Sequence, residues 1–458
     1  MDPINARHIH FIGIGGIGVS AIAHIMLFLG KKVSGSDLAE SQITGGLSSK
    51  GAQIFLGKHS SNHVQHDVDL IIYSNAVTEK NPEFTAAKKR NIPLYSYPEI
   101  LGELLKKHIP IIVSGTHGKS TTTAMLASIF IKAKLDPWVV MGTMMNFDGM
   151  QENAHIGLGR HMIVEGDEYR AAFLHYHPFA LIINNIETDH LDFYKTFGNI
   201  LKTFKMLVAQ IPSGGIVVAN ADDPSITKLL PAARCKVVTF GLNTGDYQAT
   251  HIVQHGELTR FAVKGLECFD IALKVPGQHN VKNALAAAVM SLFFGIPIEM
   301  IRAALLEFPG VWRRFEVKAE IRGSVIIDDY AHHPTEIKAT LSTARSLYPN
   351  KKIWCIFQPH SLDRTTYLFE EFANAFVDCD QVILTDIYQV AGRDSKQFRT
   401  IEELEKAIRD TGKSVKLLKT DDEILKYCKK IRTGEDVFLT VGAGTITQLN
   451  DQLVKKLK

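Results

Sequence analysis

The 458-residue sequence lacks the features that mark secreted and membrane-spanning proteins. No apolar run reaches about 18 residues, the length needed to cross a bilayer. The opening segment, residues 1–7, contains no basic stretch followed by an apolar run. The five cysteines are scattered without C-x-x-C spacing, which argues against a disulfide framework and against a zinc site. We therefore expect a cytoplasmic protein without a membrane partner.

The sequence also lacks an excess of either charge, with 51 Lys and Arg against 48 Asp and Glu. A net charge of +3 does not call for a nucleic-acid partner, and we expect none. Hydrophobic residues make up 45% of the chain, an ordinary value for a globular protein with a sizeable core. At roughly 150 residues per domain, the length favours about three domains. We expect a monomer or a weak homodimer.

A glycine turn between an apolar stretch and a helix-like segment predicts a phosphate-binding loop. The apolar stretch is 109–113, and the loop follows it as Gly115, Thr116, His117, Gly118, Lys119, Ser120 and Thr121. Backbone N–H groups of such a turn point at phosphate oxygens, the lysine adds a positive charge, and the serine hydroxyl can hold Mg²⁺. The full pattern G-x-x-x-x-G-K-[ST] would place a glycine at Val113. We predict nucleoside triphosphate binding; the alternative is a tight turn with a solvated lysine.

A second glycine turn lies near the start of the chain and predicts a nucleotide or nucleotide-sugar site. It reads Gly13, Ile14, Gly15, Gly16, Ile17 and Gly18, directly after the apolar run 8–12. Asp37 ends the next apolar segment, as in the dinucleotide-type fingerprint of a Rossmann-like fold. Glycines at these positions also allow close packing of a helix on a strand, which is the alternative interpretation.

Short apolar runs alternate with helix-like segments along the chain, which predicts an α/β fold built on parallel sheets. A polar segment at 102–108 and the breaker pair Pro309-Gly310 suggest two domain boundaries. We expect a Rossmann-like N-terminal domain (1–108), a central P-loop ATPase-type α/β domain (109–311) and a Rossmann-like C-terminal domain (312–458). Within the central domain, residues 246–275 predict a small antiparallel flap.

Polar clusters follow several of the apolar runs. Glu165, Asp167 and Glu168 end one run, and the segment 184–192, with His190, ends another. Carboxylates at strand ends beside a phosphate loop can hold Mg²⁺, which neutralises the charge on a transferred phosphoryl group. The alternatives are a solvated acidic turn and a structural histidine.

Four further positions have side chains suited to a ligand. Asn283 can bind a base edge or cap a helix, and Arg314 can reach a phosphate when domains close. The loop 328–335 concentrates acidic, phenol and imidazole groups after a buried strand, where open α/β sheets bind ligands. Arg364 lies in the segment 358–365 that follows the next such strand, and its planar fork suits a carboxylate.

Taken in order, these motifs resemble the Mur ligases, the ATP-dependent amino-acid ligases of peptidoglycan precursor synthesis. The likeness runs through nearly the whole chain and is carried by the segments 11–18, 34–37, 115–119, 185–190, 310–315, 328–336 and 357–360. The resemblance implies that L-alanine is joined to the lactyl carboxylate of UDP-N-acetylmuramate. It also implies an acyl phosphate intermediate, with ATP as the phosphoryl donor and Mg²⁺ as the metal.

The resemblance implies the UDP-sugar on the first domain, ATP on the second and the amino acid approached by the third. It places Asn283 at adenine, Asp329 at ribose and Arg314 at phosphate. The implied catalytic residues are Lys119, His190, Arg314, His332 and Arg364. The implied nucleotide-binding residues are Gly115, Thr116, His117, Gly118, Lys119, Ser120, Thr121, Asn283, Arg314 and Asp329. The implied substrate-binding residues are Gly15, Gly16, Ile17, Gly18, Ser36, Asp37, Tyr330, His332 and Arg364. The implied metal ligands are Ser120, Glu165 and His190.

The chain departs from the family pattern at four positions. It has Gly166 where alanine is usual, Arg170 where aspartate is usual and Ser120 where threonine is usual. Ser361 stands where enzymes that add alanine often carry an arginine beside the counterpart of Arg364. The acceptor amine therefore stays open among L-alanine, glycine, L-serine and a peptide.

Three other functions compete with this interpretation. A murein-tripeptide ligase of cell-wall recycling uses the same UDP-sugar and similar loops. An NAD-dependent oxidoreductase explains the glycine turn with Asp37 but leaves Lys119 without a purpose. A non-catalytic nucleotide-binding regulator predicts a damaged magnesium set, whereas Lys119, Ser120, Glu165 and His190 are all present.

Overall fold

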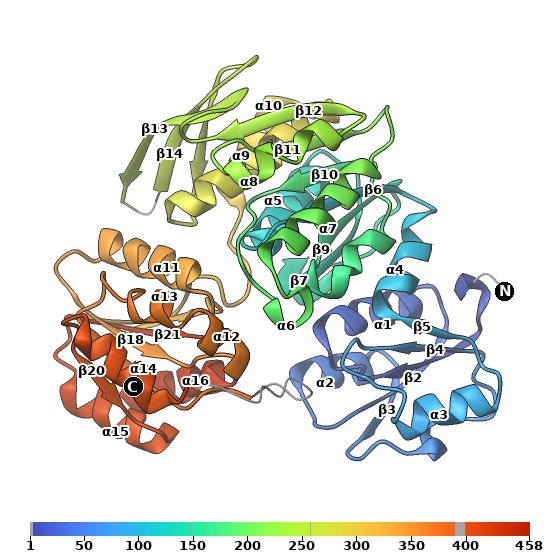
Figure 1. The fold of residues 1–458 in the computed structure, drawn as a ribbon, viewed down its shortest axis with the longest axis horizontal. Coiled ribbons are helices and arrows are strands. Elements are labelled where there is room, and N and C mark those ends of the chain that lie inside the picture. Colours follow the sequence, from blue (N-terminus) through green and yellow to red (C-terminus); the bar gives the residue numbers. More distant parts are fainter. Residues whose placement is uncertain (1–2, 148, 257, 390–398) are drawn as a thin grey trace.

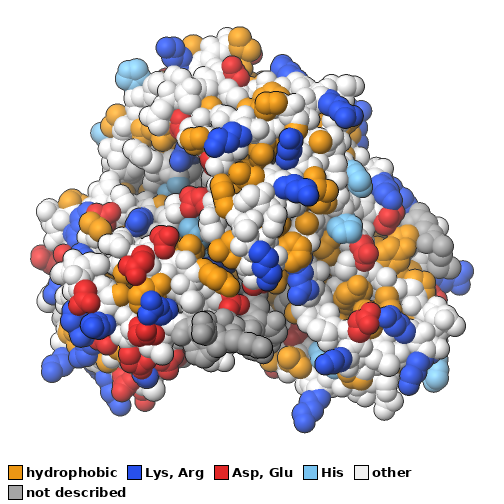
Figure 2. Space-filling model, viewed as in Figure 1, with side chains coloured by type: hydrophobic (Ala, Val, Ile, Leu, Met, Phe, Trp, Pro, Cys, Tyr) orange, Lys and Arg blue, Asp and Glu red, His pale blue; other side chains and the backbone are white. Residues whose placement is uncertain are grey.

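The computed structural model describes residues 3–147, 149–256, 258–389 and 399–458. The chain folds into three α/β domains, each with its own sheet, arranged as three lobes (Figure 1). The three-domain α/β prediction is confirmed. Among the described residues, none of the helices combines the length and the apolar character needed to cross a membrane. On the face in Figure 2, lysine and arginine side chains are spread over all three lobes.

The first domain contains a five-stranded parallel sheet in the order β3-β2-β1-β4-β5. Strand β1 lies between β2 and β4, so the strand order reverses at its carboxyl end, where open α/β sheets bind ligands. The strands are β1 (His8–Ile12), β2 (Lys32–Asp37), β3 (Gln53–Leu56), β4 (Leu70–Tyr73) and β5 (Leu94–Ser96). The helices are α1 (Ile17–Phe28), α2 (Gln42–Ser49), α3 (Pro82–Lys89) and α4 (Tyr97–Leu105), with short 3-10 turns η1 (Pro3–Asn5) and η2 (Ser61–His63).

The central domain contains a ten-stranded mixed sheet in the order β15-β14-β13-β12-β11-β10-β6-β9-β7-β8. The predicted antiparallel flap is present as β13, β14 and β15, and β13 pairs with β12, so the flap continues the main sheet. The hairpin β7–β8 at the opposite edge was not predicted. The strands are β6 (Ile109–Ser114), β7 (Trp138–Phe147), β8 (Met150–His155), β9 (His161–Gly166), β10 (Ala180–Ile183), β11 (Ile216–Asn220), β12 (Lys236–Gly241), β13 (Tyr247–His255), β14 (Leu258–Lys264) and β15 (Phe269–Leu273).

Helix α5 (Lys119–Lys132) begins directly after the phosphate loop and packs against α9 (Gln278–Phe293) and α10 (Ile298–Glu307). It is apolar on most sides because it lies between the sheet and these helices. The remaining helical segments are η3 (Tyr169–His175), α6 (Leu191–Tyr194), α7 (Phe197–Ala209), α8 (Pro224–Thr227) and η4 (Leu230–Ala232).

The third domain contains a six-stranded sheet in the order β16-β17-β21-β18-β19-β20, parallel except for the edge strand β16. Separate hydrophobic clusters cover its two faces. The strands are β16 (Glu316–Ile321), β17 (Ser324–Asp329), β18 (Lys352–Phe357), β19 (Gln381–Leu384), β20 (Val415–Leu417) and β21 (Asp436–Val441). The helices are α11 (Pro334–Leu347), α12 (Leu362–Tyr367), α13 (Phe369–Ala373), α14 (Ile401–Asp410), α15 (Asp421–Ile431) and α16 (Ile446–Leu457).

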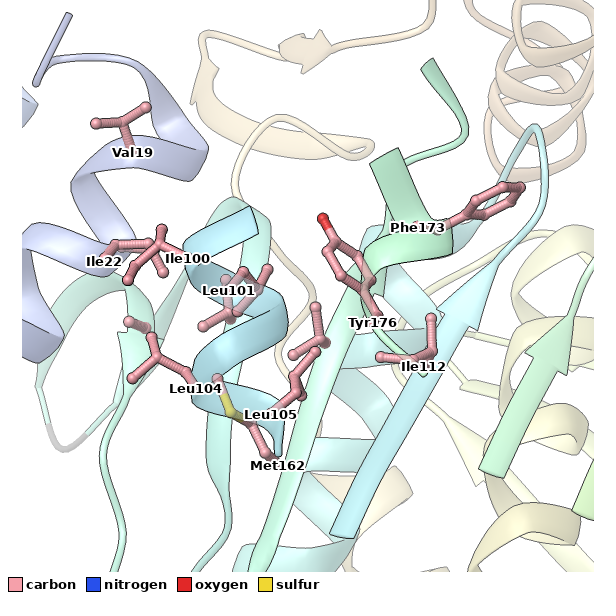
Figure 3. Packing of buried hydrophobic residues seen from close by; sticks show 14 of the residues in the cluster. Val19, Ile22, Ile100, Leu101, Leu104, Leu105, Ile112, Met162, Phe173 and Tyr176 are labelled. Atoms are coloured by element: carbon pink, nitrogen blue, oxygen red, sulfur yellow. The ribbon is translucent and has the colours of Figure 1, made fainter. Parts of the chain in front are cut away.

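The first and central domains share one continuous hydrophobic cluster. Figure 3 shows the side chains of α1 and α4 beside those of β6, β9 and η3; the labelled residues are Val19, Ile22, Ile100, Leu101, Leu104, Leu105, Ile112, Met162, Phe173 and Tyr176. Gly102 of α4 lies at this contact, and a Cβ there would come within 2.3 Å of the carbonyl oxygen of His175. Burial of this apolar surface holds the two domains together as one packed unit.

Replacing Gly102 by alanine tests this packing. We expect Gly102→Ala to lower the free energy of unfolding by about 1–3 kcal/mol, because the added methyl overlaps a backbone carbonyl that cannot rotate away. The matched control is Gly45→Ala in α2, where a Cβ meets nothing within 4 Å and the change favours the helix. Thermal or urea unfolding measures both. Equal stability of the two variants would contradict the close contact.

Candidate active site

A cavity of about 370 Å³ lies where the three domains meet. The first domain contributes the second half of its glycine turn, and the central domain contributes the phosphate loop and the acidic strand end. The third domain contributes its junction arginine and the loop after β17. The predicted site residues in its lining are Gly16, Ile17, Gly18, Thr116, Gly118, Lys119, Ser120, Glu165, His190, Arg314, Tyr330 and His332. Residues far apart in the sequence therefore face one space.

A larger cavity of about 650 Å³ lies between the central and third domains. Its volume falls in the range of small-molecule and cofactor sites. Both domains supply predicted nucleotide-binding residues to its lining: His117, Gly118, Ser120, Thr121, Asn283, Arg314 and Asp329. Ser120, Gly118 and Arg314 belong to both cavities, so the two spaces adjoin at the phosphate loop.

The phosphate loop depends on two glycines in the left-handed region, Gly115 (φ 133°) and Gly118 (φ 77°). A Cβ at Gly118 would lie 2.5 Å from Oδ1 of Asn283, and one at Gly115 would lie 2.9 Å from the carbonyl oxygen of Asn185. A side chain at either position would therefore be strained and would also collide with the strand-end loop or with α9. The turn places the N-terminus of α5 at the edge of both cavities, which favours an anion there.

Lys119 has its charge compensated within the site. Its ammonium donates to the carbonyl oxygens of Gly115 (2.7 Å) and Thr116 (3.0 Å) and forms an ion pair with Glu168 (2.9 Å). Burial opposes the charged form, but the carboxylates led by Glu168 raise the pKa of Lys119. The lysine is therefore held as a cation beside the space where a phosphate would lie.

The carboxylates after β9 divide into two groups. Glu165 accepts hydrogen bonds from the Ser120 hydroxyl (3.0 Å) and from the Gly142 amide (2.7 Å). Asp167, Glu168 and His190 form the other group, with one potential ligand atom from each within 4.8 Å of the others. Among the described residues, Nδ1 of His190 is buried without a hydrogen-bond partner. The structure therefore brings the predicted metal ligands Ser120 and Glu165 together and places His190 beside Asp167 and Glu168.

The third domain reaches the site through its junction segment. Arg314 pairs with Glu336 (3.5 Å) and lies over the ring of Tyr330. Asp329 accepts hydrogen bonds from the amides of Phe315 (2.8 Å) and Ala331 (2.7 Å), which fixes its carboxylate at the end of β17. Burial raises the pKa of Asp329 to about 6. The neighbouring Arg313 is buried against the third domain through Asp328.

His117 joins the phosphate loop to the third domain. Its Nδ1 lies 3.2 Å from Glu336 and its Nε2 lies 3.4 Å from Glu187, which also accepts a hydrogen bond from Thr335 (2.6 Å). Burial alone would lower the pKa of His117, but the hydrogen bonds to the two carboxylates raise it to about 9. Glu187 and Glu336 were missed as site residues, because only the fold brings them to the histidine.

Arg364 is paired across the same boundary. It donates two hydrogen bonds to Asp189 of the central domain, both 3.1 Å long, and lies 3.3 Å from Nδ1 of His360. His332 lies nearby; its amide donates to Glu336 (3.0 Å), and burial lowers its pKa well below the usual value. Asp189 was not among the predicted site residues, and its position directly before His190 was the one available signal.

The predicted site residues of the first domain fall into two groups, those that line the central cavity and those that do not. Gly16, Ile17 and Gly18 line the central cavity, and a Cβ at Gly18 would meet the ring of Tyr97 at 2.8 Å. The Gly15 amide donates a hydrogen bond to the Asp37 carboxylate (2.8 Å), and this bond stabilises the conformation of the glycine turn. The Ser36 hydroxyl is fully buried and donates to Glu83 (2.7 Å), so this side chain faces the interior of the domain.

Fold and site together define a three-domain nucleotide-binding α/β protein whose site is completed by all three domains. The model described as "Mur ligase family, catalytic domain" matches residues 8–109, "Mur ligase middle domain" matches 113–291, and "Mur ligase, glutamate ligase domain" matches 313–444. The chain belongs to the Mur ligase family, and the resemblance seen in the sequence is confirmed.

Individual relatives share the whole length of the chain. The UDP-N-acetylmuramate–L-alanine ligase of Clostridium kluyveri is 43% identical over 454 residues, covering 98% of each chain. That of Clostridium perfringens is 40% identical and covers 99% of each. The crystal structure of the UDP-N-acetylmuramate-alanine ligase of Thermotoga maritima has a TM-score of 0.84 at 32% identity, covering 98% of each chain. A murein peptide ligase of Psychrobacter arcticus has a TM-score of 0.75 at 26% identity, also covering 98% of each.

The raised pKa of His117 predicts how stability changes with pH. Because the folded pKa of about 9 lies above the ordinary 6.5, the stabilisation from charged His117 is complete below about pH 6.5 and is lost as the pH rises through 9. We expect wild type to exceed His117→Gln by on the order of 3 kcal/mol at pH 6 and by little at pH 10. Unfolding midpoints measured across this range check it. A difference independent of pH would contradict the pairing with Glu187 and Glu336.

Proposed function

We propose that this chain is an ATP-dependent ligase that joins L-alanine to the lactyl carboxylate of UDP-N-acetylmuramate, the activity named for its relatives in Clostridium and Thermotoga. The observation that carries the proposal is the central cavity, to which the first domain supplies a glycine turn, the central domain a phosphate loop and the third domain Arg314 and Tyr330. A reaction of three substrates requires three binding surfaces at one point. The adjoining larger cavity has room for the nucleotide.

The proposed reaction proceeds in two steps. A lactyl carboxylate oxygen attacks the γ-phosphorus of ATP, the bond to the bridging oxygen breaks, and ADP leaves with the acyl phosphate formed. The neutral amine of L-alanine then attacks the acyl carbon, inorganic phosphate leaves, and the amide loses one proton to solvent or a base. The order follows from chemistry, because a carboxylate is a poor electrophile until one oxygen becomes part of a phosphate leaving group.

The residues of this chain divide the work of the first step. The loop amides and Lys119 stabilise the phosphate oxygens from the N-terminus of α5, and Arg314, which lines both cavities, supplies a second positive charge. Asn283 and Asp329 line the larger cavity, where they would contact the adenine and the ribose. The role of these residues is to hold the two reacting oxygens and the phosphorus in line while water is excluded.

Mg²⁺ fits the donors that are present. Carboxylate and hydroxyl oxygens are the ligands that Mg²⁺ prefers, and Ser120 with Glu165 supplies both at the phosphate loop. His190, whose buried Nδ1 lacks a partner among the described residues, lies with Asp167 and Glu168. We propose that Ser120, Glu165 and His190 bind the Mg²⁺. The carboxylates of Asp167 and Glu168 would lie next to this metal site. When bound, the metal would neutralise charge on the transferred phosphoryl group.

The same proposal includes the domain boundaries near residues 108 and 311. Strand β6 begins at Ile109 and belongs to the central sheet, and β16 begins at Glu316 and belongs to the third. Each boundary therefore falls in a connection between sheets, and the second lies beside the Arg314 segment that a change of domain angle would move.

Phosphate release tests the proposed activity. With ATP, Mg²⁺ and UDP-N-acetylmuramate, we expect sustained release of phosphate only when an accepted amine is added, because the acyl phosphate otherwise accumulates in the site. L-alanine, glycine, L-serine and a muropeptide stem are compared, together with NADH oxidation. Release with the stem alone would identify a murein peptide ligase instead. No release with any amine would refute the ligase assignment.

Lys119, the first residue of α5, provides a second test of the proposed activity. We expect Lys119→Ala to reduce turnover by about a thousandfold or more, because it removes the cation that faces the transferred phosphoryl group. Binding of the UDP-sugar, measured by calorimetry, should change little, because the first domain holds it. The matched control is Lys132→Ala at the far end of α5, where the ammonium pairs with exposed Glu307. Loss of UDP-sugar binding in Lys119→Ala would contradict the partition between domains.

A further inference from the structure

Two histidines and a glutamate from different domains meet beside the larger cavity. His117 belongs to the phosphate loop and Glu187 follows β10 in the central domain, whereas His333 directly precedes α11 in the third domain. One potential ligand atom from each lies within 4.8 Å of the others. The two imidazole rings are 4.6 Å apart between their centroids. The proposed reaction assigns no role to Glu187 or His333, so this cluster calls for an explanation of its own.

The separations between the polar atoms suit ligands of one metal ion. Nε2 of His117 lies 3.4 Å from Oε2 of Glu187, and Nδ1 of His333 lies 3.7 Å from the same oxygen. Bonds of about 2.0–2.1 Å place neighbouring ligands of a tetrahedral zinc site about 3.3 Å apart. Small rotations of the side chains would therefore bring all three atoms to the bonding distance of a single ion.

Each histidine has a partner at its other ring nitrogen. Nδ1 of His117 lies 3.2 Å from a carboxylate oxygen of Glu336, and Nε2 of His333 donates to the backbone carbonyl oxygen of Thr188 (3.3 Å). Histidines that bind a metal usually donate their second ring N–H to a carboxylate or a backbone carbonyl, which fixes the ring and its tautomer. Both outer partners of such a site are therefore present, and the remaining nitrogens are the two that lie near Glu187.

Thr335 holds the same groups in place. Its hydroxyl donates to Oε2 of Glu187 (2.6 Å), which keeps the carboxylate beside both imidazoles. Its amide donates a longer hydrogen bond (3.3 Å) to Nδ1 of His333, and a metal ion would replace this bond. An ion bound to Nε2 of His117 would likewise replace a proton, which leaves to solvent, so the site keeps a positive charge beside the carboxylate.

We propose that His117, Glu187 and His333 form a binding site for a transition-metal ion of the Zn²⁺ class, with a water molecule as the fourth ligand. Two imidazole nitrogens and one carboxylate oxygen suit such an ion, whereas Mg²⁺ prefers oxygen ligands alone. The site is therefore different in position and in chemistry from the magnesium ligands at Ser120 and Glu165.

An ion at this site would link two domains. His117 and Glu187 belong to the central domain and His333 to the third, so one ion bonded to all three opposes their separation. His117 and Glu187 also line the larger cavity, which gives the ion a path from solvent. We expect the bound ion to inhibit turnover, because it holds shut the boundary at which the nucleotide enters. This inhibition rests on the proposed ligase function, whereas binding of the metal does not.

The first experiment measures metal binding with Co²⁺, which occupies the same tetrahedral sites as Zn²⁺ and absorbs visible light. In excess Mg²⁺, we expect wild type to show the intense visible bands of tetrahedral Co²⁺ and to lose them when Zn²⁺ is added. His333→Gln should weaken binding of both ions by about tenfold or more, since even loss of an outer partner of a metal-bound histidine costs about 10–100-fold. The control is His255→Gln on β13, where the side chain is exposed and the affinity should not change.

Two results would overturn the inference. One is equal affinity for Co²⁺ in wild type and folded His333→Gln. The other is a spectrum dominated by charge transfer from thiolate, which would place the ion on a cysteine. If His333→Gln fails to fold, Glu187→Gln removes another ligand and is judged by the same measurement.

The second experiment measures inhibition by Zn²⁺ in the phosphate-release assay with Mg²⁺ in excess. We expect half-inhibition of wild type at the Zn²⁺ concentration that fills half of the site, and His333→Gln to require about tenfold more. The same sensitivity in both proteins would refute the inhibitory role. A wild type inactive with every amine would refute the ligase proposal instead, and the Co²⁺ measurement would still decide whether the metal site exists.

Discussion

Charge compensation across the boundary between the central and third domains is the constraint on which the site depends. Two ion pairs cross this boundary: His117 of the central domain pairs with Glu336 of the third, and Arg364 of the third domain pairs with Asp189 of the central one. None of these charges could stay buried alone, so the third domain must sit where it supplies or receives the partner. The same pairs form walls of the cavities. The ion pairs that hold the central and third domains in contact therefore involve side chains to which a charged substrate can also bind.

The other domain boundary is built on a different principle. The first and central domains share an apolar cluster around α1, α4 and η3. A bound ligand cannot substitute for these apolar contacts one by one, as it can for an ion pair. This contrast divides the molecule into a packed pair and a third domain attached through exchangeable polar contacts. Such a division suits the proposed ligase reaction, because substrates must enter and products must leave at the boundary of the third domain. Relative motion is therefore expected at the Arg314 segment rather than at Gly102.

Local pattern was sufficient for much of the fold. The two glycine turns, the strand-end carboxylates and the antiparallel flap were all predicted from short segments, because each depends on interactions within a few residues or on simple alternation. The hairpin β7–β8 was missed, since its long strands include a glycine and pack partly against α1 of the first domain. Ser36 illustrates the same limit of local pattern. Its motif is local, but Glu83, which accepts its hydrogen bond inside the domain, lies 47 residues away along the chain.

By itself, the sequence determined the kind of protein this is: three α/β domains, a triphosphate loop with Lys119, and a family resemblance strong enough to propose the reaction. Only the tertiary structure decided which charges meet. Asp189 with Arg364 and His117 with Glu336 join residues separated by 175 and 219 positions, and no periodicity or spacing encodes such a pairing. The physical reason is that a charge acts over distances in space. Its partner, its burial and its pKa exist only after the domains have come together.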